Sequence, residues 1–355
     1  MSTDEKYMQR CLELARLASG NTAPNPMVGS VLVHRDRIIG EGYHQLYGQA
    51  HAEANAIESV ENKTLLKEAT LYVNLEPCAH HGNTPPCADL IVRAGIPRVV
   101  IGAGDSSARV SGKGIRILEE GGCEVKRGVL EDSCRYLNRR FFTFHEKQRP
   151  YVVLKWAQTL DGYIDKDRRK DDPIQPNWIT NEVSRHLVHK WRSQEQSILI
   201  GSHTALKDNP GLNVRESHGL DPLRIVIDRD LEIDESFKLI HDPLPLVLFT
   251  DINSDPRRAR ELAEYNVEVI RLNFKDNLMR QIFEFLYSRK ILSVFVEGGG
   301  YTLSQFIASN MWDEARVFIG NRFFHSGVKA PQLPAREASE YMELNDTRLY
   351  IFRNQ

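Results

Sequence analysis

The stretch HAEANAIESVENKTLLKEATLYVNLEPCAHHGNTPPCADLIVRAG, residues 51–95, decides how the first half of this chain folds. Its order of apolar and polar residues predicts a helix over 51–62, a strand over 69–76 and a second helix over 86–95. Prolines are tolerated in the first turn of a helix, so the double proline before the second helix is compatible with this prediction. The stretch therefore reads as helix, strand and helix.

The same alternation continues on both sides. Residues 29–43 predict a hairpin and residues 97–103 another strand. At the N-terminus, Ser2 and Glu5 have the spacing of a helix capping box. Apolar strands that alternate with helices indicate a layered α/β domain.

A second alternating series follows a polar, proline-ended stretch at 145–150, so we expect two domains, 1–146 and 147–355. Between its strands lie helical patterns such as 181–194 and 277–288. Its expected strands are 151–157, 196–202, 223–228, 245–250, 267–272, 291–299 and 315–320. The charged stretch at 166–177 interrupts the series and is expected to be a mobile loop.

The composition is that of a globular protein of 355 residues, with 41% hydrophobic and 26% charged residues. The formal net charge of -2 gives no sign of a nucleic-acid or membrane-binding surface. The sequence shows no apolar run of membrane-spanning length and no signal peptide, which favours the cytoplasm. Five cysteines are too few, and odd in number, for a disulfide framework.

Four residues of the opening stretch have the chemistry of a catalytic metal site. His51, Cys78 and Cys87 supply one imidazole and two thiolates, which suit tetrahedral zinc with water in the fourth position. Zinc lowers the pKa of such a water to near neutrality. Glu53 could then move the water proton to a leaving nitrogen, as in the H-x-E and P-C-x-x-C signature of zinc nucleobase deaminases.

The spacing leaves alternatives open. Eight residues separate the cysteines, where the signature has two. A structural zinc site, or thiols that merely pack in a core, would also place two cysteines here. Structural sites usually carry four protein ligands, however, and have no need for Glu53.

HAEANA, LEPCAHHGNTPPC and NPMVGSVLV together resemble the bifunctional riboflavin-biosynthesis deaminase/reductase family, in which an eight-residue loop separates the cysteines. The resemblance implies a cytidine-deaminase-like domain with His51, Cys78 and Cys87 on zinc and Glu53 as proton shuttle. It places Asn25, His44 and His80 at the substrate, and gives His81 no role. The remaining cysteines, Cys11, Cys123 and Cys134, are expected to be ordinary buried thiols.

The second half resembles the reductase part of the same family through KWAQTLDGYID, WIT, ILIGSHTALKDNPGLNVR and VEGGG. This implies a dihydrofolate-reductase-like α/β domain that uses NADPH. The residues implied beside the substrate are Arg192, Leu212, Arg215 and Glu297. Those implied beside the cofactor are Gln158, Trp178, Thr204, Asp208, Gly299, Gly300, Tyr301, Thr302, Leu303, Ser304 and Gln305.

Three positions depart from the family pattern: Asn83, Ser107 and Pro176. Because a substrate phosphate needs a cation, Arg109 or Lys113 is our candidate to supply one. The resemblance implies a phosphorylated pyrimidine substrate, no nucleic-acid or membrane partner, and a homo-oligomer. The alternatives are a deaminase of free nucleotides or tRNA, a zinc-stabilised sensor of a flavin precursor, and a reductase fold without activity.

Overall fold

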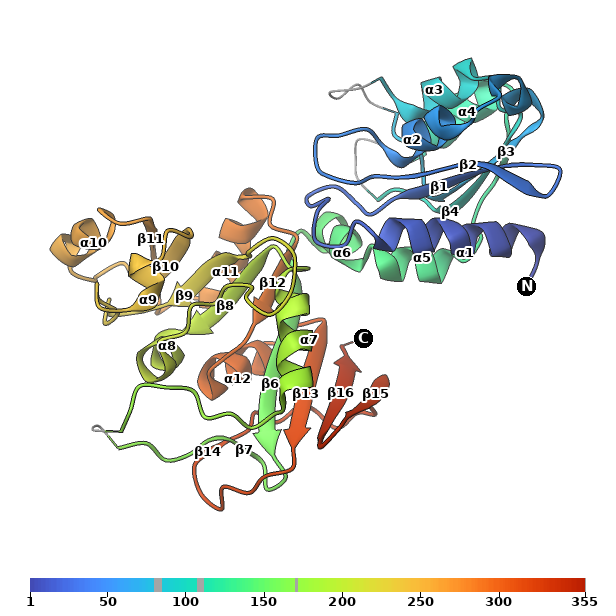
Figure 1. Cartoon of the computed structure of the whole chain (residues 1–355). Helices are drawn as coiled ribbons and strands as arrows, with labels where there is room; N and C mark the ends of the chain where they lie inside the picture. The colour runs from blue at the N-terminus through green and yellow to red at the C-terminus, as the bar shows by residue number, and fades with distance from the viewer. Residues whose placement is uncertain (80–84, 107–111, 170–171, 355) are drawn as a thin grey trace. The chain divides into compact units, whose positions relative to one another are not determined.

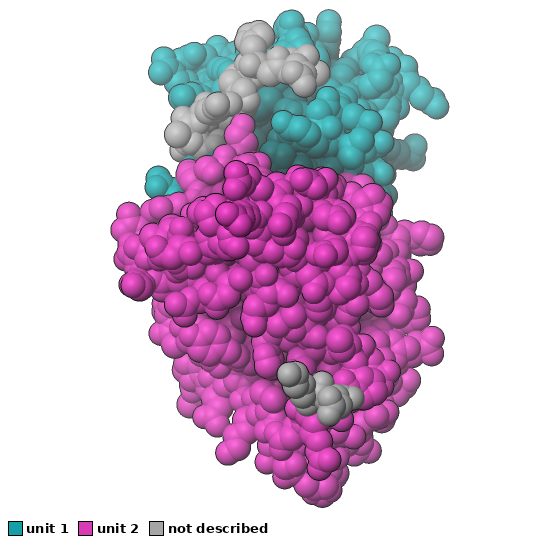
Figure 2. All heavy atoms as spheres, turned by 90° about the vertical axis from the view of Figure 1, so that its left-hand side faces the viewer, with its two compact units in different colours: residues 1–148 teal, residues 149–355 magenta. Residues whose placement is uncertain are grey.

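The computed structural model describes residues 1–79, 85–106, 112–169 and 172–354. Two compact units divide the chain, residues 1–148 and 149–355, which Figure 2 colours separately. In the described ranges, no helix is both long and apolar enough to cross a membrane.

The first unit is a five-stranded sheet in the order β2-β1-β3-β4-β5. β1 (Gly29–His34) and β2 (Arg37–Tyr43) form the predicted hairpin, and β1 also pairs antiparallel with β3 (Thr70–Leu75). β4 (Arg98–Ala103) and β5 (Glu124–Lys126) continue the sheet in parallel with β3.

Helices cover both faces of this sheet (Figure 1). One face carries α1 (Thr3–Arg16), α5 (Glu131–Leu137) and α6 (Arg139–Lys147), and the other carries α2 (Ala52–Ser59), α3 (Cys87–Arg93) and α4 (Lys113–Glu120). A 3-10 turn spans Lys63–Glu68. The capping box predicted at Ser2 and Glu5 is formed at the start of α1. α6 runs on to Lys147, so much of the polar stretch at 145–150 is helical rather than loop.

The second unit is built on a nine-stranded sheet in the order β11-β10-β9-β8-β12-β6-β13-β16-β15. Seven neighbours, β11 to β13, run parallel, and β16 and β15 are antiparallel at one edge. The strands are β6 (Tyr151–Thr159), β8 (Ser197–Gly201), β9 (Leu223–Ile227), β10 (Leu246–Asp251), β11 (Val267–Leu272), β12 (Ser293–Val296), β13 (Glu314–Gly320), β15 (Glu340–Leu344) and β16 (Thr347–Arg353). β7 (Tyr163–Asp165) and β14 (Val328–Lys329) form a separate pair.

Two apolar layers hold this sheet between helices. α7 (Glu182–Arg192), α8 (Ser202–Asp208), α9 (Lys238–His241) and α10 (Pro256–Leu262) contribute buried side chains to one layer. α11 (Leu278–Ser288) and α12 (Gly300–Ala308) contribute to the other. Strands covered on both faces read as continuous apolar runs, which is why the sequence predicts strands such as β8, β10 and β12 well.

Candidate active sites

The three predicted metal ligands meet on one face of the first unit. His51 is the residue before α2, Cys78 lies beyond the end of β3, and Cys87 is the first residue of α3. His51 Nδ1 lies 3.5 Å from Cys78 Sγ and 3.4 Å from Cys87 Sγ. The three donor atoms all lie within 4.8 Å of one another.

This donor set fits zinc. Bonds of about 2.3 Å to sulfur and about 2.0 Å to nitrogen at tetrahedral angles separate the two donors by about 3.5 Å. Hydrogen bonding from Cys87 lowers the pKa of the Cys78 thiol to about 4, and the same contact raises the pKa of Cys87. One sulfur of the pair is therefore a thiolate, the form that binds metal.

Glu53 lies in the first turn of α2, two residues beyond His51, and its side chain is buried. Burial raises the pKa of Glu53 to about 7, and the neighbouring Cys78 charge adds to the increase. A carboxyl group whose pKa lies near the working pH can both accept and return a proton.

Asn25 and His44 form a polar pair beside this cluster. Asn25 Nδ2 lies 3.2 Å from His44 Nε2, and His44 Nδ1 lies 3.1 Å from the carbonyl oxygen of Ala50. Since a carbonyl only accepts, Nδ1 carries the proton and Nε2 accepts from Asn25. The rings of His44 and His51 are 5.3 Å apart, which places the pair next to the metal ligands.

Several sequence predictions lie outside the described residues: His80, His81, Asn83, Ser107 and Arg109. Lys113 begins α4. The other three cysteines, Cys11, Cys123 and Cys134, are buried as predicted.

Glu76 is a residue that sequence reasoning missed. Its buried carboxylate accepts hydrogen bonds from the backbone N–H groups of Asp105, Gly112, Gly114 and Ile115. It thereby joins the end of β3, two residues before Cys78, to the start of α4.

In the second unit, Arg192 and Glu297 form a buried, two-bonded ion pair. Arg192 Nε and Nη2 lie 2.7 and 2.8 Å from the two Glu297 oxygens, and Arg192 Nη1 donates to Asn213 O at 3.0 Å. Arg215 Nη1 donates to Asn213 Oδ1 at 2.9 Å. Leu212, between these groups, has a left-handed backbone and a buried side chain. The four residues predicted at the substrate therefore converge.

The charge of this cluster affects its neighbours. The backbone N–H of Arg215 donates to His189 Nδ1. Burial, with the charges of Arg192 and Arg215, lowers the pKa of His189 to about 4. His189 is thus neutral at pH 7 and adds no positive charge to the cluster.

Lys155 is a second residue that sequence reasoning missed. Its Nζ lies 3.8 Å from Glu297 Oε2, and burial lowers its pKa. Burial opposes ionisation of Glu297, but Arg192 and Lys155 lower the pKa of that carboxyl to about 2. The sequence places Lys155 on a strand, and an isolated lysine there carries no signal of this contact.

The glycine turn at Gly299 and Gly300 begins α12 and packs against α8. A Cβ at Gly299 would lie 2.8 Å from Thr204 Oγ1, and one at Gly201 would lie 2.6 Å from Thr302 Oγ1. Such closeness leaves room for backbone only, and free N–H groups at a helix start suit a phosphate. Along α12, Tyr301, Ser304 and Gln305 are exposed, whereas Leu303 is in the apolar core.

The other residues predicted at the cofactor make contacts of their own. Gln158 Oε1 accepts from Trp156 Nε1 at 2.9 Å. Trp178 is half exposed, with the Arg185 guanidinium 4.9 Å from its ring centre. Asp208, on the last turn of α8, is bonded to Arg168, and Pro176 is exposed.

Comparison with known proteins gives the family. Residues 150–349 match the model of the RibD C-terminal domain, and residues 1–103 match the cytidine and deoxycytidylate deaminase zinc-binding region. The riboflavin biosynthesis protein RibD of Aquifex aeolicus (strain VF5) is 38% identical over 98% of this chain and 95% of its own length. The chain belongs to the RibD family.

Solved structures of similar proteins match nearly the whole length of the chain. A deaminase/reductase from Thermotoga maritima has a TM-score of 0.86 at 36% identity, and Acinetobacter baumannii RibD has 0.88 at 30% identity. Each match covers 99% of both chains.

Membership of the RibD family confirms the two-domain α/β fold and the bifunctional activity predicted from the sequence. The protein is a deaminase and reductase of riboflavin biosynthesis that acts on a small-molecule pyrimidine. Its cofactors are zinc, in the deaminase region with the His/Cys/Cys cluster, and NADPH, which a RibD reductase domain implies.

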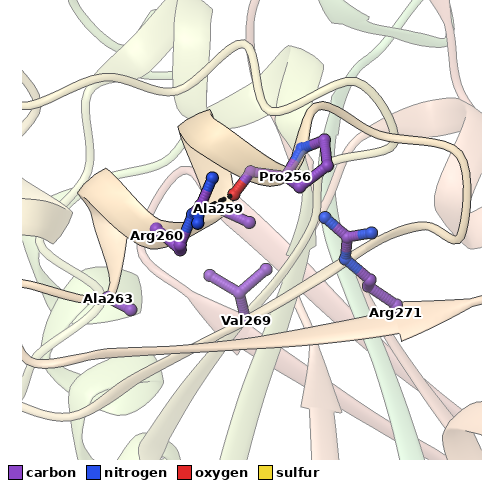
Figure 3. A pocket seen from close by; sticks show the side chains of 6 residues that line it. All are labelled: Pro256, Ala259, Arg260, Ala263, Val269 and Arg271. Carbon is purple, nitrogen blue, oxygen red and sulfur yellow. Dashed lines mark hydrogen bonds between the residues drawn. The ribbon is translucent and has the colours of Figure 1, made fainter.

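A pocket of about 390 Å³ in the RibD reductase unit lies elsewhere (Figure 3). Its lining comes from α10, the residue that follows α10, and β11: Pro256, Ala259, Arg260, Ala263, Val269 and Arg271. These elements lie at the sheet edge opposite β15, and the predicted site residues are not among them.

Proposed function

We propose that this chain deaminates 2,5-diamino-6-(5-phosphoribosylamino)pyrimidin-4(3H)-one to 5-amino-6-(5-phosphoribosylamino)uracil, and then reduces the ribosyl group to ribityl with NADPH. The Thermotoga maritima relative is named for these two steps. We assign the first step to residues 1–146 and the second to residues 147–355. The observation that carries the proposal is the buried Glu53 carboxyl group beside the His51, Cys78 and Cys87 donors.

In the first step, the protein's own residues position the substrate and move protons. Zinc held by His51, Cys78 and Cys87 supplies the Lewis acid that activates water near neutral pH. Glu53 accepts a proton from the attacking water and delivers it to the departing amino group. A C–O bond forms at the carbon bearing the 2-amino group, its C–N bond breaks, and ammonia leaves.

Substrate recognition in the first unit falls to Asn25, His44 and His80. With its amide nitrogen bonded to His44, Asn25 has its Oδ1 available to accept from an N–H of the pyrimidine edge. The charge on the substrate phosphate requires a cation, and Arg109 and Lys113 remain our candidates.

In the second step, NADPH would supply a hydride to the ribosyl carbon attached to nitrogen. The bond from that carbon to the ring oxygen breaks, and the oxygen takes a proton. Arg192, Leu212, Arg215 and Glu297 surround the substrate in this proposal, and the arginines suit its phosphate. Lys155 is our candidate to supply the proton, because it is buried beside Glu297 and burial lowers its pKa.

The nucleotide of NADPH would lie across α8 and α12. The glycine turn and the start of α12 would bind its phosphate oxygens through backbone N–H groups. Thr204, Asp208, Gln158 and Trp178 surround this turn in the proposal, together with the stretch from Gly299 to Gln305.

The direct test uses the purified, zinc-loaded protein with the diaminopyrimidine, with and without NADPH, and mass spectrometry of the products. We expect a deaminated product alone without NADPH, and a deaminated and reduced product with it. Deamination that never proceeds to reduction would refute the reductase assignment. No product in either tube would refute the substrate and draw attention to Asn83 and Ser107.

The RibD resemblance also leads us to propose a cytoplasmic homo-oligomer. Light scattering after size exclusion measures the mass directly. A mass of one chain, 40.6 kDa, at micromolar concentration would contradict this proposal.

A further inference from the structure

Asn74 and Asn138 are two buried side-chain amides that the proposed chemistry does not use. Asn74 lies on β3 and is fully buried, and Asn138, which is 3% exposed, is the residue between α5 and α6. Both amides bond to the main chain of Met27, in the segment that joins α1 to β1 (Figure 1). We call these two asparagines, bonded to Met27, the asparagine clamp.

The asparagine clamp satisfies both main-chain groups of Met27. The N–H of Met27 donates to Asn138 Oδ1 at 2.8 Å, and its carbonyl oxygen accepts from Asn138 Nδ2 at 2.9 Å and from Asn74 Nδ2 at 3.1 Å. Asn74 Oδ1 also accepts from the N–H of Gly29 at 2.8 Å. Because β1 begins only at Gly29, these amides take the place of a neighbouring strand at Met27.

The asparagine clamp lies two residues from Asn25, which we propose to contact the substrate. Between them stands Pro26, whose ring fixes its own φ and disfavours helical backbone at the residue before it. On the other side, the N–H of Asn25 donates to the carbonyl oxygen of Thr22 at 2.8 Å. Little conformational freedom remains between Met27 and Asn25, so a shift of Met27 moves Asn25.

Asn25 in turn belongs to the polar pair beside the metal ligands. Its Nδ2 lies 3.2 Å from His44 Nε2, and the His44 ring lies 5.3 Å from that of His51. This contact leaves Asn25 Oδ1 to accept from an N–H of the pyrimidine. Displacement of Asn25 would therefore weaken binding of the pyrimidine, whereas Glu53 is held by a different segment, α2.

We propose that Asn74 and Asn138 are positioning residues of the deaminase, which act on substrate binding through Asn25. This inference rests on the proposed function, because it takes Asn25 to contact the pyrimidine. It predicts an effect on KM rather than on kcat, since a contact made equally in the bound substrate and in the transition state changes KM alone.

The test measures ammonia release by the full-length, zinc-loaded protein over a range of diaminopyrimidine concentrations. For Asn74→Ala and for Asn138→Ala we expect KM to rise at least tenfold, with kcat changed less than threefold and the zinc content unchanged. Asn62→Ala is the matched control. It removes an exposed amide that accepts from the N–H of Thr64 at 3.1 Å, outside the asparagine clamp, and its KM should stay within threefold of the wild-type value.

A double-mutant cycle decides whether the asparagine clamp acts through Asn25. In Asn25→Ala the amide that we place at the substrate is gone, so adding Asn138→Ala should raise KM less than threefold further. A further rise of threefold or more would show that Asn138 acts by another route and would overturn the proposal. A KM within threefold of the wild-type value in both single clamp variants would also overturn it.

Asn138→Asp replaces Asn138→Ala in the same cycle if the alanine variant does not fold. It has nearly the same shape and still accepts from the N–H of Met27, but it no longer donates to the Met27 carbonyl oxygen. We expect the same rise in KM and the same loss of the effect in the Asn25→Ala background.

Failure of the proposed function gives different results. Absence of ammonia release by the wild-type protein would refute the substrate, and an unchanged KM in Asn25→Ala would refute the contact of Asn25 with it. Either result refutes the role of the asparagine clamp as well. If Asn25→Ala raises KM but the clamp variants lower only kcat or the zinc content, the proposed function stands, the asparagine clamp is merely structural, and this inference is refuted.

Discussion

Asp4 shows how much one buried charge contributes to the deaminase unit. It lies in the first turn of α1, and its carboxylate meets three strands through Tyr72 at 2.9 Å, Arg98 at 3.1 Å and Lys126 at 2.7 Å. Burial raises the pKa of Asp4, but these hydrogen bonds outweigh it and lower the pKa to about 2. The ionised form is therefore preferred in the folded protein.

We expect Asp4→Asn to destabilise the deaminase unit by about 2 kcal/mol at pH 7. Because the folded pKa lies below the ordinary value of 3.8, this contribution is complete above that value and is lost as the pH falls through about 2. Hydrogen exchange of β3 and β4 amides measures the change within this unit. Glu124→Gln, which removes an exposed partner of Arg98, should change stability by less than about 1 kcal/mol. Equal effects of the two substitutions would contradict the argument.

At the scale of elements, glycines bring the helix with Glu53 close to its sheet. A Cβ at Gly42 on β2 would lie 2.4 Å from Ala56 N and 2.7 Å from Ala52 O, both on α2. A Cβ at Gly40 would lie 2.6 Å from Ala56 O. Only glycine allows this separation, and α2 fixes where Glu53 stands.

Gly42→Ala should therefore push α2 away from β2, at a cost of roughly 1–3 kcal/mol. We expect deaminase kcat/KM to fall at least tenfold while reductase activity is unchanged, since the displaced helix belongs to the first unit alone. Gly104→Ala is the matched control, because a Cβ there has its nearest contact at 3.9 Å. A Gly42→Ala protein with full ammonia release would show that α2 tolerates the displacement.

Among the described residues, Glu76 accepts backbone hydrogen bonds from Gly112, Gly114 and Ile115 at the start of α4 and from Asp105 after β4. Glu76→Ala leaves these N–H groups without their acceptor, and bonds to a charged group are worth about 1.5–3 kcal/mol each. We expect the deaminase KM to rise at least tenfold with the zinc content of the protein unchanged, measured by kinetics and metal analysis. Glu119→Ala, an exposed position on α4, should have no such effect. Loss of zinc together with activity would mean that Glu76 supports the metal site instead.

The zinc cluster could be predicted from sequence because its chemistry restricts the residue types and their order. The C-terminal hairpin of β15 and β16 was missed, although its alternating residues and the turn at Asn345 were a usable signal. Glu76 and Lys155 could not be found in that way. Their partners lie 29 to 142 residues away along the chain, and single charged residues carry no local pattern.

At the scale of the whole molecule, the two candidate sites lie in different units. All the described residues of each site belong to a single unit. The donors around Glu53 lie in 1–148 and the Arg192 cluster lies in 149–355. We expect Glu53→Gln to reduce ammonia release about 100-fold, because the proton shuttle is lost, and to leave reduction of supplied aminouracil substrate unchanged. We expect Arg192→Met to reduce the reductase activity and to leave ammonia release unchanged. Mass spectrometry of each half-reaction measures both, and loss of both activities in either variant would contradict independent sites.

The strand order has a consequence for synthesis on the ribosome. In the first unit every strand finds its neighbours by Lys126. β6 opens the second unit but sits between β12 and β13, which begin at Ser293 and Glu314. Protein synthesis adds about 5–20 residues per second, so several seconds or more pass between the synthesis of β6 and that of β12 and β13. During that time an apolar strand lacks its neighbours, so we expect the second half of this chain to depend more on chaperones during synthesis than the first half.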